Sequence, residues 1–195
     1  MSVVVHEVSH GYAANLLGDP TAKYAGRLTL NPLKHLDPVG SVILPIVLAI
    51  IPPHMVFGWA KPVPYNPYNL RNKRWGDLIV AGAGPLSNIL LAVFFGLAVR
   101  FSVADPMFAL SFVRIASTIV FVNLMLAIFN LVPIPPLDGS KIVLGLLPMY
   151  QSMKMRIVLD RYGIIFLLIF IFFLWQYVAP VVGVLFQLIT GVALY

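Results

Sequence analysis

Residues 78–99 read LIVAGAGPLSNILLAVFFGLAV, a stretch of 22 residues without a charged side chain. About 20 apolar residues are enough for a helix to cross the hydrocarbon core of a bilayer. The whole chain has this character, because 60% of its 195 residues are hydrophobic and 10% are charged, against about 25% charged residues in a soluble domain. The sequence therefore predicts an all-α polytopic membrane protein, with a single membrane-embedded domain over residues 1–195.

Further apolar runs cover residues 108–132, 164–178 and 181–195. The last two are short for a crossing; they are interpreted as two tilted spans, with one span plus an interfacial helix as the alternative. The first helix, expected from Ser2 to Leu17, reaches only about 24 Å, less than the roughly 30 Å of the hydrocarbon core. Its N–H groups need cover from upstream residues, a neighbouring helix or a second chain, which leaves homo-oligomerisation open. About five transmembrane helices are expected.

Residues 40–57 are also apolar, but Pro45, Pro52 and Pro53 interrupt them. Basic residues concentrate on both sides of this segment and again in residues 133–162, and basic loops stay cytoplasmic. A segment with cytoplasmic loops at both ends does not cross once. A re-entrant or β-hairpin-like element is expected around residues 24–65, and a sixth crossing is the alternative. The basic residues concerned are Lys23, Arg27, Lys34, Lys61, Arg71, Lys73, Arg74, Lys141, Lys154, Arg156 and Arg161.

The only glutamate of the chain, Glu7, lies within His6-Glu7-Val8-Ser9-His10. Residues four apart share one helix face, so His6 and His10 can bind one metal ion. Two histidines and a carboxylate are a zinc ligand set of hydrolases, and an adjacent glutamate acts as their general base. The alternative is a surface helix with two unrelated histidines, but the apolar residues before His6 disfavour it. The pattern predicts a zinc site with Glu7 as base.

A third ligand must come from the aspartates, because the chain has no cysteine and no other glutamate. Asp138 follows a long apolar run through Pro133, Pro135 and Pro136, a backbone that cannot be helical throughout and is expected to line a cavity. The position of each of the other five aspartates has a sufficient structural explanation, so Asp138 is favoured. These five are Asp19, Asp37, Asp77, Asp105 and Asp160.

Three segments resemble, in order, the signature segments of the site-2 proteases, which are intramembrane zinc metalloproteases. The segments are HEVSH (residues 6–10), GPLSN (84–88) and NLVPIPPLDG (130–139). Two more, GRLTLNP (26–32) and GWAKPVP (58–64), look like the short bacterial and archaeal branch that lacks extra domains. The likeness covers residues 3–147, and the C-terminal helices expected over residues 157–195 lie beyond it.

The resemblance implies one Zn²⁺ per chain, held by His6, His10 and Asp138, with Glu7 as the catalytic base. It adds Asn130, which corresponds to an asparagine that stabilises the oxyanion or positions substrate. The implied enzyme is a zinc metalloendopeptidase in the cell membrane of a prokaryote, with its active site toward the cytoplasmic side. Its substrate is a membrane protein, cut in a locally unwound transmembrane helix. Residues 24–30 and 59–64 could hold that peptide by strand addition.

Two other functions remain as alternatives: a catalytically inactive relative that binds membrane helices, and a small multi-pass transporter. Transporters commonly consist of repeated halves, and the chain shows no internal repeat. Its net charge of +6 is distributed over loops beside apolar spans, where it sets orientation and contacts anionic lipids. Nucleic acid is therefore not an expected partner, and the lipid bilayer is.

Overall fold

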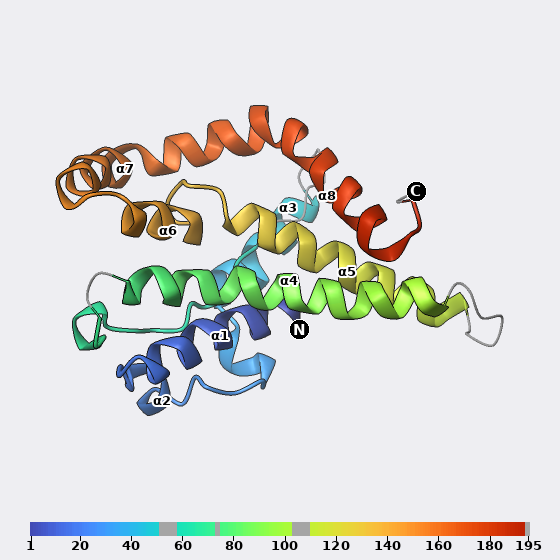
Figure 1. Ribbon diagram of the computed structural model, residues 1–195, viewed down its shortest axis with the longest axis horizontal. Coiled ribbons are helices and arrows are strands. Elements are labelled where there is room, and N and C mark those ends of the chain that lie inside the picture. The colour runs from blue at the N-terminus through green and yellow to red at the C-terminus, as the bar shows by residue number, and fades with distance from the viewer. Residues whose placement is uncertain (51–57, 73–74, 103–109, 194–195) are drawn as a thin grey trace.

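The computed structural model describes residues 1–50, 58–72, 75–102 and 110–193. These residues form helices joined by turns and extended segments, and no β-strand occurs among them. Figure 1 shows two long helices through the middle of the molecule, the N-terminal helices on one side and the C-terminal helices on the other. The prediction of an all-α membrane protein is confirmed.

Helices α4 (Gly76–Ser102) and α5 (Leu110–Asn130) form the centre and lie side by side (Figure 1). Both are long and apolar enough to cross a membrane, as the runs at residues 78–99 and 108–132 predict. Residues 103–109 fall outside the described part. Aliphatic side chains and one phenylalanine form the core between the two helices and α8: Ala92, Val120, Leu124, Val182 and Phe186.

Helix α1 (Ser2–Leu16) packs against α4, and the short α2 (Thr21–Tyr24) follows it. The 15 residues of α1 extend over about 22 Å, which is short for a helix that crosses a membrane. Gly18 ends the helix region with a positive φ of 106°, a conformation that favours glycine. Asn123 on α5 donates to Ser2 Oγ at 2.9 Å. A neighbouring helix therefore contacts the first residue of α1, one of the expected ways to cover this end.

Residues 24–65 contain short helices and extended backbone. A 3₁₀ helix covers Pro32–His35, a π-helix covers Pro38–Ile43, and α3 covers Leu44–Ile50. The run Pro38–Ile50 is apolar but short, and residues 51–57 lie outside the described part, so a full crossing there stays untested. A further 3₁₀ turn, Pro67–Asn69, precedes α4.

The hairpin-like alternative for residues 24–65, and the strands suggested at residues 24–30 and 59–64, do not occur among the described residues. Pro62 and Pro64 have no N–H for a ladder. The two N–H groups beside Pro62 are already used, since Lys61 N donates to His35 O and Val63 N donates to Glu7 Oε2. The segment is extended, but its backbone bonds go to other parts of the fold.

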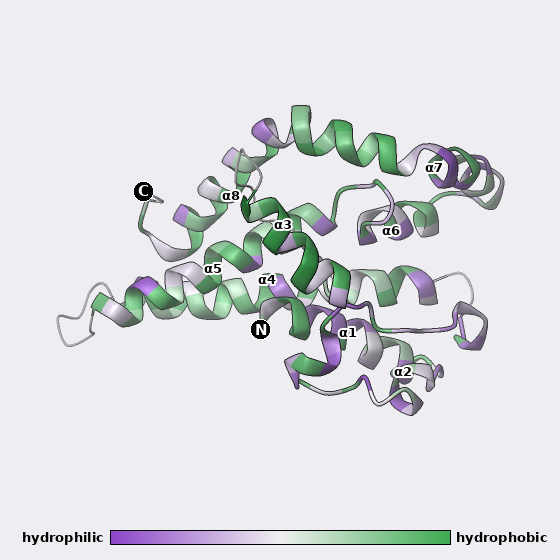
Figure 2. Ribbon diagram, turned by 180° about the vertical axis from the view of Figure 1, so that it is seen from behind, coloured by the Kyte–Doolittle hydropathy of each residue, from purple (hydrophilic) through white to green (hydrophobic). Residues whose placement is uncertain are grey.

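The C-terminal part begins with α6 (Asp138–Leu146), which packs on α4, followed by α7 (Met149–Ile169). A π-helical segment, Phe170–Leu174, connects α7 to α8 (Trp175–Thr190). The path turns at this junction (Figure 1). Figure 2 shows mostly hydrophobic colour along α5 and the later part of α7, and more hydrophilic colour in the first part of α7 and around α1 and α2.

The two apolar runs at residues 164–178 and 181–195 are not separate helices among the described residues, which end at residue 193. Met149–Thr190 is one helical run of 42 residues, and it is the third candidate span by length and apolarity. Pro180 lies inside α8; a proline removes one backbone hydrogen bond and bends a helix without ending it when apolar neighbours keep the rest of the backbone paired. The number of crossings, expected to be about five, stays a prediction.

Candidate metal centre

Helix α1 brings His6 and His10 to one buried face. The two imidazole rings meet edge to face with centroids 4.7 Å apart, and the residues are 5% and 9% exposed. Burial of two polar rings requires partners for their nitrogens. The partners come from α4 and α6, which pack around this face of α1.

Asp138 is the first residue of α6, directly after the proline-rich turn that follows α5. A carboxylate is favoured there because the N-terminus of a helix carries partial positive charge. Its Oδ2 lies 3.1 Å from His6 Nε2 and 3.3 Å from His10 Nε2, and the two Nε2 atoms are 3.1 Å apart. Residues separated by more than 120 positions in the sequence thus meet at one point.

The Nδ1 atom of each histidine is hydrogen-bonded to a residue of α4. His10 Nδ1 donates to Val80 O at 2.7 Å, because a carbonyl can only accept. His6 Nδ1 faces Asn88 Oδ1 at 2.6 Å, and Asn88 Nδ2 donates to Asn123 Oδ1 at 2.7 Å, which fixes the amide orientation. Both Nδ1 atoms therefore carry the proton, and both Nε2 atoms present lone pairs toward Asp138.

Three lone-pair atoms at this separation repel one another unless a proton or a metal ion lies between them. Ligand atoms about 2.0–2.1 Å from a tetrahedral zinc ion lie about 3.3 Å from one another. The three distances of 3.1–3.3 Å match that spacing, and the donor set of two imidazoles and one carboxylate is one that zinc accepts. His6, His10 and Asp138 therefore fit a zinc ion.

Burial raises the pKa of the Asp138 carboxyl, but hydrogen bonds that His10 and His6 donate when their Nε2 atoms are protonated outweigh burial and hold that pKa below its usual range; a cation bound in place of those protons acts in the same direction. The carboxyl is therefore ionised at neutral pH, as a metal ligand must be.

Gly84 on α4 lies directly against the imidazole rings of His6 and His10. A Cβ built on Gly84 would collide with His10 Nε2 and would lie 2.6 Å from His6 Cε1. A Cβ built on Gly82 meets nothing within 4 Å. The absence of a side chain at Gly84 thus lets α4 approach the imidazole rings closely.

Glu7 lies beside the two histidines on α1, and its carboxylate is oriented from the extended segment before α4. Val63 N donates to Glu7 Oε2 at 2.9 Å. A carboxylate offers about four lone-pair sites on its two oxygens, so this bond leaves the group able to accept a further proton. Glu7 and the three possible ligands line the same cavity, of about 160 Å³.

Asn130, the last residue of α5, lines this cavity too. Its Nδ2 donates to Leu126 O at 2.9 Å, and the second proton of the amide nitrogen is left for another acceptor. The structure thus brings together all five residues that the sequence singles out: His6, Glu7, His10, Asn130 and Asp138.

Sequence reasoning missed Tyr65 and Lys141, which also line the cavity. Lys141 follows Asp138 by three positions and so shares its helix face, a signal that was available. Its Nζ lies 5.0 Å from the centroid of the Tyr65 ring. Burial and a hydrogen bond to Asp77 raise the pKa of Tyr65, so its hydroxyl keeps its proton; nothing local in the sequence indicates this tyrosine.

The other aspartates in the described part lie away from the metal-binding group. Asp19 accepts from Thr21, Asn66 and Asn69, and Asp37 caps the helix Pro38–Ile43. Asp77 accepts from Tyr65, and Asp160 is on α7. Asp105 falls outside the described residues. None of these described aspartates belongs to the metal-binding group, as the sequence analysis expects for them.

Comparison with known proteins gives consistent results. The model of peptidase family M50 matches residues 98–174. A protein of Bacillus subtilis named "Putative zinc metalloprotease YwhC" is 39% identical over 184 residues, covering 91% of this chain and 80% of that relative. No solved structure gives a significant match.

Two mycobacterial proteins named Rip2, with the same zinc metalloprotease designation, match over 139 residues. The protein of Mycolicibacterium smegmatis is 34% identical and that of Mycobacterium tuberculosis is 31% identical. Each match covers 71% of this chain and 51% of the relative, so the chain spans about half the length of these two proteins. The identity and coverage of the Bacillus subtilis match, together with the family match, lead to one conclusion: the chain belongs to peptidase family M50, the site-2 proteases, and is a metalloprotease.

Proposed function

We propose that the protein is a zinc endopeptidase that cuts transmembrane segments of membrane proteins within the bilayer. The observation that supports this most directly is the convergence of His6 Nε2, His10 Nε2 and Asp138 Oδ2, with Glu7 lining the same cavity. Membership of the M50 family supports a peptide substrate. The long apolar helices support a substrate within the membrane.

His6, His10 and Asp138 would hold one zinc ion per chain. Bound zinc supplies two effects: it polarises a peptide carbonyl, and it lowers the pKa of a water molecule to about 7. The protein contributes ligand orientation, since the contacts of His6 with Asn88 and of His10 with Val80 fix both imidazole tautomers. An ionised Asp138 completes the set.

Glu7 is proposed as the general base and acid. Its carboxylate takes a proton from the attacking water and gives it to the departing amine. The bond from Val63 N to Glu7 Oε2 keeps the carboxylate at a fixed place beside the ligands. A positioned base of this kind contributes typically 10²–10⁴-fold to rate.

Asn130 is proposed as a donor to the substrate carbonyl oxygen as it gains negative charge. The bond from its Nδ2 to Leu126 O orients the amide, and the remaining N–H is available at the cavity. A preorganised donor in such a place typically contributes about 10²–10³-fold. Loss of the Asn130 amide is therefore expected to lower the rate without removing zinc.

The size of the cavity indicates the state of the substrate. A helix with its side chains is about 10–12 Å across, too wide for a cavity of about 160 Å³. An unwound peptide presents its carbonyl groups, which a helix keeps in internal hydrogen bonds. The substrate is therefore a transmembrane segment that opens locally, at residues of low helix propensity.

The active site is proposed to face the cytoplasmic side of a prokaryotic cell membrane. The segments beside it, residues 58–72 and 133–162, are rich in lysine and arginine, and basic loops are retained in the cytoplasm. The basic segments and the metal centre would then lie toward the same side of the bilayer.

The proposal can be tested by cleavage of a membrane-spanning reporter by the purified chain, compared with Glu7→Gln and Ser9→Ala. Ser9 lies in the same motif, but its hydroxyl donates to Val5 O within the helix, so Ser9→Ala is a matched control. Wild type and Ser9→Ala are expected to cut, and Glu7→Gln is expected to lose at least 10²-fold in rate while keeping its zinc. A zinc-loaded wild type that cuts no reporter would favour the inactive relative that binds membrane helices.

A further inference from the structure

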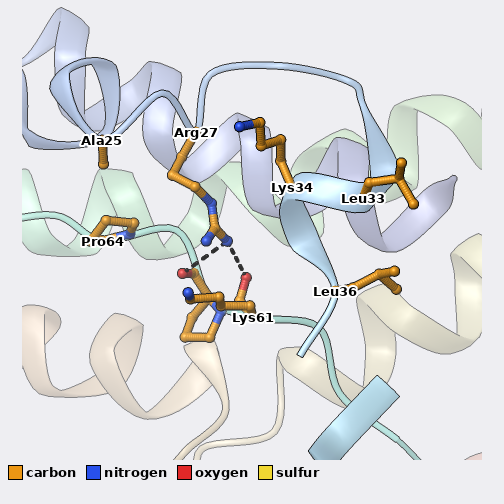
Figure 3. Close-up of a pocket in the computed structure, with 8 residues that line it drawn as sticks. Ala25, Arg27, Leu33, Lys34, Leu36, Lys61 and Pro64 are labelled. Atoms are coloured by element: carbon orange, nitrogen blue, oxygen red, sulfur yellow. Dashed lines mark hydrogen bonds between the residues drawn. The ribbon is translucent and has the colours of Figure 1, made fainter. Parts of the chain in front are cut away.

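A second cavity, of about 460 Å³, lies between the loop that follows α2 and the extended segment before α4. In Figure 3, Arg27 and Lys34 lie on the chain segment that follows α2, and Lys61 lies on the facing segment. Leu33 and Leu36 also line it. The cavity shares Pro62 with the candidate metal centre but none of the proposed ligands, so it is a separate feature of the fold.

Arg27 lies at the centre of this cavity. The residue is 7% exposed, and its Nη2 donates to Lys61 O at 2.6 Å and to Pro62 O at 3.3 Å (Figure 3). Its Nε is buried and has no hydrogen-bond partner among the described residues. A guanidinium has five donors, and a buried donor without an acceptor is costly. The site therefore lacks an acceptor beside Nε.

The positive charge of the cavity is also uncompensated. The cavity is lined by Arg27, Lys34 and Lys61 and by no acidic residue. In the part of the chain that the structure describes, the ion pairs involve only His6, His10 and Asp138. Three cations around one cavity repel one another, and an anion among them removes the repulsion. Arginine and lysine together are typical of phosphate recognition.

The apolar rim indicates where such a phosphate comes from. Leu33 is 72% exposed and Leu36 is 45% exposed, and both line the cavity beside the cations. The facing segment precedes α4, a candidate span that begins at Gly76, 12 residues after Pro64. Cations next to exposed leucines, in a chain with long apolar helices, match a lipid, whose phosphate is charged and whose chains are apolar.

We propose that the cavity lined by Arg27, Lys34 and Lys61 binds the phosphate of an anionic phospholipid of the surrounding membrane, with the lipid chains directed over Leu33 and Leu36. Arg27 then has two roles: Nη2 holds the carbonyls of residues 61 and 62, and the rest of its guanidinium contributes donors and positive charge toward the lipid phosphate. This binding is independent of proteolysis, and its test uses no cleavage assay.

The test is binding of dihexanoyl phosphatidylglycerol to the purified full chain in a neutral detergent, by titration calorimetry. Dihexanoyl phosphatidylcholine and inorganic phosphate are the comparison ligands. The variants are Lys34→Gln, Lys61→Gln and their double mutant, with Lys23→Gln as the matched control because Lys23 is exposed on α2 and does not line the cavity. Arg27→Gln is added, with circular dichroism to check its fold.

Phosphatidylglycerol is expected to bind more tightly than phosphatidylcholine. Each lysine removed is expected to weaken the affinity about five-fold, the double mutant more, and Lys23→Gln less than two-fold. Phosphatidylglycerol binding that is unchanged in the double mutant, or equal binding of phosphatidylcholine, would overturn the site. Inorganic phosphate that binds as tightly as phosphatidylglycerol would overturn the lipid as the source of the anion.

Discussion

The α1–α4 interface and the helical run Met149–Thr190 differ in how they are stabilised, although both are predominantly apolar. At the interface, His6, Asn88 and Asn123 are at least 95% buried, and each is hydrogen-bonded to a residue of another helix. In the helical run, only 6% of the most apolar window is buried. Hydrogen bonds between particular side chains determine how the helices of the first region pack. The second region depends on its overall apolar character and needs few specific contacts.

The polar chain at the interface shows what this specification requires. It runs from His6 to Asn88 on α4, then to Asn123 on α5 and back to Ser2 on α1. Hydrogen bonds between helices replace water where none is available. A single substitution there breaks several bonds, while a substitution on the lipid-facing side breaks none. The predictions below test this contrast.

Gly84→Ala is expected to have the largest effect. The new methyl group would collide with His10 and with His6, and α4 would have to move away from α1. A displacement of about 1 Å at a catalytic site can lower the rate about 10²-fold. Gly82→Ala is the matched control, because it makes the same change in the same helix with open space around the Cβ. Reporter cleavage by both variants measures the difference, and equal activity would refute the close approach.

Asn88→Ala is expected to lower zinc affinity about 10–100-fold, because His6 loses the partner that fixes its Nδ1 proton. Asn88→Asp keeps an acceptor toward His6 and is expected to recover most of the affinity. Asn123→Ala, which does not contact His6, is expected to have a smaller effect. Competition with a zinc chelator measures all three. Equal affinities of Asn88→Ala and Asn88→Asp would show that the amide acts only through packing.

Asp19, in the loop after α1, gives a pH-dependent effect. Burial opposes its ionisation, but hydrogen bonds from Thr21, Asn66 and Asn69 outweigh burial and hold the pKa of its carboxyl below its usual range. Because the folded-state pKa is lowered, its stabilisation is present above the unfolded pKa of about 3.9 and is lost as pH falls through the folded-state pKa.

Asp19→Asn is therefore expected to lower the free energy of unfolding by about 1–3 kcal/mol at pH 7. The difference from wild type should narrow as pH falls below about 4. Melting temperature in detergent at several pH values measures this. Asp160→Asn, an exposed change on α7, is the control. A gap between Asp19→Asn and wild type that stays constant with pH would show that the carboxylate charge is not the cause.

The smallest effects on stability are expected for substitutions in the helical run Met149–Thr190, where the burial of the substituted residue determines the size of the effect. Val182 is 2% exposed within the core with α4 and α5, and Val184, two residues later, is 66% exposed. Val182→Ala is expected to destabilise the fold by about 1–2 kcal/mol, and Val184→Ala by less than about 0.5 kcal/mol. Melting temperatures in detergent compare the pair. A larger loss at Val184 would indicate that this face packs against protein.

Local patterns in the sequence were sufficient where helical spacing decides the structure. The repeat from His6 to His10 places both rings on one face of α1. The apolar run at residues 78–99 predicts α4. The choice of Asp138 among six aspartates depended on the prolines before it, which prevent a continuous helix and direct the chain to a cavity.

Contacts between distant residues could not be predicted in this way. Val63 N meets Glu7 across 56 positions, and Asn88 meets His6 across 82; spacing contains no information about either. The continuity of α7 and α8 was missed because hydropathy does not distinguish a proline inside a continuous helix, as Pro180 is in α8, from a turn between two helices. The β-hairpin-like alternative for residues 24–65 does not occur among the described residues, because Pro62 and Pro64 have no N–H for a ladder.

The most direct test of the central claim is the zinc content of the purified chain, measured by elemental analysis for wild type, Asp138→Ala and Asp160→Ala. The three-atom site predicts one zinc per chain in wild type and in Asp160→Ala, and little or none in a folded Asp138→Ala. A folded wild type without zinc after incubation with the ion, or full zinc retention in Asp138→Ala, would contradict it.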